Sequence, residues 1–166
     1  LTICPHCYNI FKNEYPDLGA DFQVVNYLQF LDQMILEGKL RIPESRFHDV
    51  SITYHDPCYL GRGNDIYAEP RSILKKLTDN FIELGRNKSY SYCCVAVGAQ
   101  MFKEAEPGNK EVFIERTEEI LKSKAEIVAT ACPFCMTMLT DGLKYKNNED
   151  VKNLDIAELI VQGLGL

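Results

Sequence analysis

The chain has 166 residues, 46% of them hydrophobic and 25% charged, which is typical of a water-soluble globular protein with a substantial core. Its formal net charge is −6, and its basic residues are interspersed with acidic ones. This balance argues against nucleic-acid and anionic-membrane surfaces, which need basic patches, and no apolar run approaches the roughly 20 residues of a membrane-spanning helix.

The first residue is Leu1 rather than a methionine, and no signal-peptide pattern follows it. We therefore expect the chain to be a segment of a longer protein. We expect a cytoplasmic location, with membrane association only through missing segments or partner subunits.

Strand-like and helix-like segments alternate along the chain. In chain order, we expect strands at 22–26, 51–55, 80–84 and 126–131, and helices at 27–38, 70–77, 110–124, from Cys132 onward, and 155–164. This alternation predicts an α/β fold with a mainly parallel sheet flanked by helices and right-handed crossovers.

The helix predicted at 110–124 has the clearest amphipathic pattern in the chain. Helical spacing predicts an inner face made of Val112, Phe113, Thr117, Ile120 and Leu121.

A Thr-x-Cys-Pro-x-Cys motif occurs twice, at residues 2–7 and at residues 130–135. At the same offset Leu28 aligns with Ile156, so the similarity runs through the motif, a helix, a short strand and the following helix. We interpret residues 1–48 as the end of one unit and residues 49–166 as a complete second unit, packed together as one globule.

Seven cysteines are an odd number for a disulfide framework. The adjacent pair at 93 and 94, together with two Cys-x-x-Cys motifs, fits metal or redox chemistry in a reducing compartment. The seven are Cys4, Cys7, Cys58, Cys93, Cys94, Cys132 and Cys135.

Three chemistries remain open for these thiols. A thioredoxin-like dithiol at a helix start would have a lowered pKa, but it leaves Cys58 and the 93–94 pair without a role. A structural zinc site would use thiolates from the second unit. An iron–sulfur cluster suits soft thiolates from three loops that meet at the carboxyl ends of parallel strands.

The segments HDPCYLGR, the Cys93-Cys94 pair and CPFC, at these spacings, resemble the cysteine-rich CCG domain found in the B-type subunit of heterodisulfide reductase and in related glycolate-oxidase-type iron–sulfur proteins. The resemblance covers nearly all of residues 50–166. It implies an iron–sulfur electron-transfer domain of a multi-subunit oxidoreductase, with other iron–sulfur or flavin subunits as partners.

The resemblance also implies a noncubane [4Fe-4S] cluster. Its ligands would be Cys58, Cys93, Cys94, Cys132 and Cys135. Cys4 and Cys7 would serve a first cluster whose other cysteines lie outside this chain, so we expect them to be idle here. The alternative function is a zinc-binding or metal-free structural module.

The chain departs from the family pattern after the paired cysteines, where Val95 and Val97 stand in place of glycines. Glycine permits a positive φ and a close approach of the backbone to a cluster, whereas a β-branched residue disfavours both. We expect the two valines to remodel this loop, to weaken cluster binding or to abolish it. We expect the neighbouring His55 and Asp56 to shape the turn into the Cys58 loop, with tuning of the cluster as the alternative role.

Overall fold

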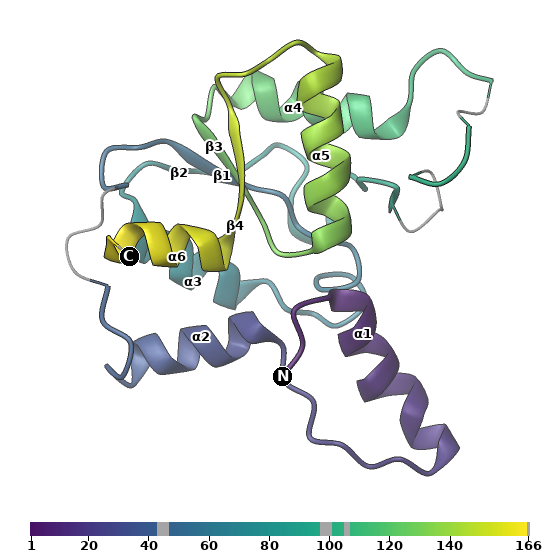
Figure 1. Ribbon diagram of the computed structural model, residues 1–166, viewed down its shortest axis with the longest axis vertical. Helices are drawn as coiled ribbons and strands as arrows, with labels where there is room; N and C mark the ends of the chain where they lie inside the picture. The colour runs from purple at the N-terminus through teal and green to yellow at the C-terminus, as the bar shows by residue number, and fades with distance from the viewer. Residues whose placement is uncertain (43–46, 97–100, 105–106, 166) are drawn as a thin grey trace.

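A computed structural model describes residues 1–42, 47–96, 101–104 and 107–165 of the chain. It has an α/β architecture with a parallel sheet flanked by helices, as the sequence predicts, and the sheet has four strands (Figure 1). The strands are β1 (Ile52–Tyr54), β2 (Phe81–Ile82), β3 (Ile127–Thr130) and β4 (Lys152–Asp155). The helices are α1 (Pro5–Asn9), α2 (Tyr27–Leu36), α3 (Ala68–Leu77), α4 (Val112–Ser123), α5 (Pro133–Tyr145) and α6 (Ile156–Leu164). A π-helical turn (Ile10–Glu14) and two 3₁₀ turns (Tyr15–Leu18 and Lys88–Tyr90) complete them.

All strand pairs are parallel, and the strand order is β2-β1-β3-β4. The second strand in sequence, β2, pairs with one edge of β1, and the third strand, β3, pairs with the other edge. The order therefore reverses between β1 and β3, and the loops that follow these two strands diverge at that point. Such a switch point, at the carboxyl ends of the strands, is where open α/β sheets bind ligands.

Helices cover both faces of the sheet. Figure 1 shows α4 and α5 on one face and α3 and α6 on the other, with α2 packed outside against α3. Alternate residues of β3 feed two cores: Ile127 and Ala129 join the larger one beside α3 and α6, and Val128 joins the smaller one beside α4 and α5. This alternation is what a strand buried on both faces requires.

The two Cys-Pro-x-Cys motifs begin similar structures. In each, the proline occupies the first turn of a helix, where its missing N–H costs no hydrogen bond. A capping box follows each motif, at Asn26 before α2 and at Asp155 before α6. The Tyr27 hydroxyl donates to the Asp155 carboxylate at 3.0 Å, so the two helix starts lie side by side.

The strand predicted at 22–26 is wrong. Asn26 makes only an isolated parallel bridge to Thr2, through hydrogen bonds from Thr2 N to Val25 O and from Tyr27 N to Thr2 O. Residues that favour β-structure form a strand only where another strand is available to pair with them.

The predicted inner face of α4 is partly wrong. Thr117 and Ile120 are buried, but Val112 is exposed, and Arg116 is fully buried. Thr117 faces inward because it packs closely against α5: a Cβ added to Gly142 of α5 would lie 2.0 Å from Thr117 Oγ1. Within the described residues, no helix is long and apolar enough to cross a membrane.

Candidate metal centre

The five cysteines between residues 49 and 166 gather at the carboxyl ends of the strands. Cys58 lies in the loop after β1, the Cys93–Cys94 pair in the long segment after β2, and Cys132 with Cys135 at the start of α5 after β3. The parallel sheet brings these loops to one edge because all of its strands point the same way.

Four of the thiols form two close pairs. The Sγ atoms of Cys58 and Cys93 are 4.0 Å apart, and those of Cys94 and Cys135 are 3.1 Å apart. Cys94, Cys132 and Cys135 are buried in one small cluster, whereas Cys58 and Cys93 are half-buried. The structure therefore brings together all five cysteines that the sequence pointed to.

This donor set fits a soft metal group. Two thiolates bonded to one tetrahedral metal at about 2.3 Å lie roughly 3.8 Å apart, which is close to the Cys58–Cys93 separation. The pKa values of neighbouring thiols are shifted in opposite directions. Hydrogen bonding with the Cys58 and Cys94 thiols, helped by the backbone N–H of Val95, lowers the pKa of Cys93 to about 2. Hydrogen bonding with Cys93 and burial raise the pKa of Cys58.

Val95 adopts the backbone conformation that glycine favours. Its φ is +57°, and its N–H donates to Cys93 Sγ at 3.2 Å. A β-branched residue in the left-handed region is strained, by of order 1–3 kcal/mol. The backbone at position 95 thus has the positive φ expected of a glycine, although the residue is a valine. Val97 lies outside the described residues.

A buried ion-pair network holds two of the cysteine loops together. The Arg71 guanidinium binds Asp56 through two hydrogen bonds, at 2.8 and 2.9 Å, and also binds Glu83. Asp56 accepts a further hydrogen bond from the backbone N–H of Lys88 at 2.8 Å. Asp56 therefore does shape the turn into the Cys58 loop, because it ties the end of β1 to α3 and to the segment that carries Cys93.

His55 lies close to the sulfurs. It is buried, and one of its ring nitrogens lies within 4.8 Å of the Cys94 and Cys135 Sγ atoms. Its Nδ1 accepts a 3.0 Å hydrogen bond from Nε of the buried Arg116. Burial away from water is the main cause, and the positive charge of Arg116 the second, of a pKa of His55 that lies well below its ordinary value. Hydrophobic periodicity gave no sign of this charged residue on the inner face of α4.

The first motif has different surroundings. Cys7 is exposed and Cys4 is half-buried, with the Cys4 Sγ 3.5 Å from His6 Nδ1. The His6 ring packs against Tyr59 and Phe134, at centroid separations of 4.5 and 5.2 Å. A role for His6 in joining the two motifs was not evident from the sequence, since its partners come from distant loops.

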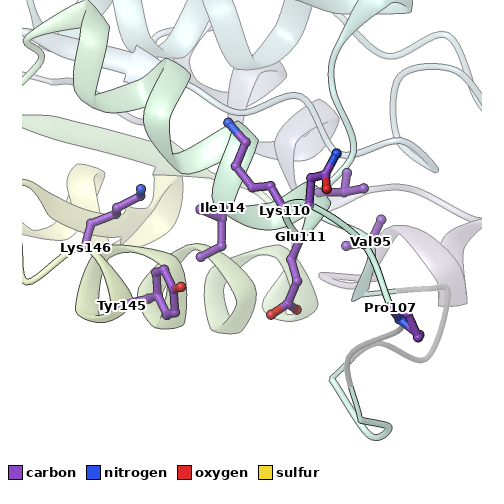
Figure 2. Close-up of a pocket in the computed structure, with 10 residues that line it drawn as sticks. Val95, Pro107, Lys110, Glu111, Ile114, Tyr145 and Lys146 are labelled. Atoms are coloured by element: carbon purple, nitrogen blue, oxygen red, sulfur yellow. The ribbon is translucent and has the colours of Figure 1, made fainter.

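A cavity of about 550 Å³ lies next to the paired-cysteine loop. Figure 2 shows Val95 on one side, Ile114 of α4 at the centre, and Tyr145 and Lys146 from the end of α5 on the other side. Its cations are neutralised locally, because Lys110 pairs with Glu115 and Glu118 and Lys146 pairs with Glu118.

Known proteins are similar in sequence to this chain. The family model described as the CCG cysteine-rich domain matches residues 52–140. The chain is 43% identical over 166 residues to a probable iron-sulfur-binding oxidoreductase, FadF, of Bacillus subtilis. It is 38% identical over 167 residues to the EtfAB:quinone oxidoreductase of Syntrophomonas wolfei. It is 33% identical over 171 residues to one subunit of the dihydromethanophenazine:CoB–CoM heterodisulfide reductase of Methanosarcina acetivorans.

These similarities cover nearly the whole chain but only part of each relative. The matches include 99%, 96% and 100% of this chain, and 23%, 23% and 41% of the three relatives in turn. The chain thus spans less than half the length of the relatives that it matches.

Proposed function

Because the chain belongs to the cysteine-rich CCG domain family, we propose that residues 49–166 form an iron–sulfur electron-transfer domain of a larger oxidoreductase. The gathering of thiols from three loops at the switch point of the sheet carries the proposal. Soft thiolates of this kind are the ligands of iron–sulfur clusters. The proposed cluster is a noncubane [4Fe-4S] group with the ligands Cys58, Cys93, Cys94, Cys132 and Cys135.

A cluster supplies one-electron redox chemistry when bound, and the residues of the chain supply its environment. Burial of Cys94, Cys132 and Cys135 keeps water from the inner side of the site. The backbone N–H of Val95 donates to Cys93 Sγ and so stabilises a thiolate there. Hydrogen bonds to sulfur and limited solvent access are the means by which a protein sets a cluster's reduction potential.

Residues 1–48 are proposed to be the end of a preceding unit of the same kind. The parallel between α1 and α5, and between the capping boxes of α2 and α6, supports this division. Cys4 and Cys7 would then complete a second thiol set with residues from outside this chain.

The partners proposed are iron–sulfur or flavin subunits that exchange single electrons with this domain. Relatives whose names specify a quinone oxidoreductase or part of a heterodisulfide reductase support this assignment. The electrons would pass onward to a disulfide or toward a quinone.

Anaerobic reconstitution with iron and sulfide tests the proposal. We expect uptake of about four iron and four sulfide per chain and an EPR signal in one redox state. The Cys93→Ser/Cys94→Ser variant should lose this iron. Unchanged iron in that variant would refute the ligand assignment.

A zinc site is the second candidate, since the His55 ring, Cys94 and Cys135 lie within the span of a mixed nitrogen–sulfur site. Stoichiometric zinc in the purified protein, with no iron uptake on reconstitution, would establish this candidate in place of the cluster.

A further inference from the structure

The pairing of His55 with Arg116 determines which ring nitrogen carries the proton. Arg116 Nε donates to His55 Nδ1 at 3.0 Å, and both side chains are buried. A guanidinium has only donors and stays protonated in proteins, so it cannot accept a hydrogen bond. Nδ1 must therefore offer its lone pair, and the proton of the neutral imidazole lies on Nε2.

Arg116 is held firmly in this position. Its Nη1 donates to the Arg86 carbonyl at 2.9 Å and to Glu119 Oε2 at 2.8 Å. Glu119 in turn accepts hydrogen bonds from the backbone N–H and from Nε of Arg86, at 2.7 and 3.0 Å. These contacts pair the guanidinium with a carboxylate and orient its Nε–H toward His55.

The other ring nitrogen of His55 is left free to bond to the sulfur site. Nε2 is buried and has no hydrogen-bond partner among the described residues. The sulfurs of Cys94 and Cys135 lie within 4.8 Å of a ring nitrogen, and Nδ1 is already occupied by Arg116. A buried N–H without a partner costs free energy, which a negatively charged sulfur acceptor would recover.

We infer that His55 is an N–H donor to the sulfurs of the loaded site and not a metal ligand, with Arg116 as the positioning residue that fixes its tautomer. A ligating histidine needs a lone pair on the nitrogen that faces the metal and usually donates its other N–H to an acceptor. His55 has the opposite arrangement. The inference deepens the proposed function, because it assigns a hydrogen bond to the same cluster.

The expected consequence is a shift in reduction potential. An N–H donor stabilises the more negative, reduced state of a cluster more than the oxidised state. In the full-length, reconstituted protein, His55→Phe should lower the ratio of reduced to oxidised cluster about tenfold at the wild-type midpoint, which corresponds to about 59 mV for one electron.

The variant His55→Gln is the conservative rescue. Its amide oxygen can accept from Arg116 and its NH₂ group can donate to sulfur, so it should restore most of the lost potential. His48→Gln, at an exposed histidine, is the matched control and should leave the potential unchanged. Arg116→Met, which frees the tautomer, should shift the potential in the same direction as His55→Phe.

The tautomer can be tested without any cluster. In the metal-free protein, ¹⁵N NMR of the histidine rings should show His55 protonated on Nε2 only, and Arg116→Met should give a mixture of tautomers. A proton on Nδ1 in the wild type would overturn the inference, and so would loss of bound iron or zinc in His55→Gln. A wild-type protein that takes up no cluster would refute the proposed function alone, whereas a normal cluster with potentials insensitive to His55 would refute only this inference.

Discussion

The two Cys-Pro-x-Cys motifs each begin a helix but have very different surroundings. Both start a helix with proline in the first turn. Cys135 of the second motif is buried, with Cys94 Sγ at 3.1 Å, while Cys7, at the equivalent place in the first, is exposed. The motif therefore specifies a helix start and a pair of thiols. Loops from other strands of the sheet decide whether these thiols belong to a larger site.

The first prediction concerns the buried ion-pair network beside the second motif. Asp56→Ala leaves the buried Arg71 and the Lys88 N–H without their shared partner. We expect a loss of about 2–4 kcal/mol in the free energy of unfolding, because Arg71 keeps only its ion pair with the partly exposed Glu83 and the Lys88 N–H loses its acceptor. Chemical denaturation of the metal-free protein measures it.

Asn13→Ala is the matched control near the first motif, since it removes side-chain hydrogen bonds to Asn9 and Asn64 that are exposed. It should cost less than about 1 kcal/mol. Similar losses in the two variants would mean that the second motif has no special framework.

The second prediction concerns the strained backbone beside the paired cysteines, which has no counterpart in the first motif. Val95→Gly removes the strain of a positive φ, which costs the folded protein about 1–3 kcal/mol. The glycine also adds conformational entropy to the unfolded chain, which offsets about 1 kcal/mol of this gain. We expect cluster retention against a chelator to increase several-fold in the reconstituted protein. Ala96→Gly, at the next residue, is the control and should give no gain; equal retention in wild type and Val95→Gly would show that the strain does not limit occupancy.

The third and smallest prediction concerns the contact between the two motifs. His6→Ala removes the ring packed on Tyr59 and Phe134. Pairs of this kind are worth about 0.5–1.5 kcal/mol, so thermal unfolding should shift by a few degrees while bound iron stays constant. Loss of iron in this variant would place His6 within the site.

The sequence was a good guide wherever one residue's environment follows from its neighbours along the chain. The apolar run at 126–131 and the amphipathic segment at 110–124 predicted β3 and α4, and the parallel order of the strands then placed Cys58 near Cys93. The strand predicted at 22–26 failed because a strand depends on a partner that composition does not reveal.

The roles of Arg116 and His55 depend on contacts between residues far apart in the sequence. A charged residue at position 116 is consistent with a solvent-exposed place on an amphipathic helix, yet it is fully buried. Its burial is possible only because Glu119, the Arg86 carbonyl and His55 satisfy its donors. Such compensation is visible only once the loops have been placed together.

Parallel iron analysis of two double variants of the 166-residue chain tests the central claim most directly. After anaerobic reconstitution, Cys132→Ser/Cys135→Ser should hold almost no iron, and Cys4→Ser/Cys7→Ser should hold as much as the wild type. Equal iron in both variants, or loss of iron only in the Cys4/Cys7 variant, would contradict the assignment of the cluster to the second motif and its converging loops.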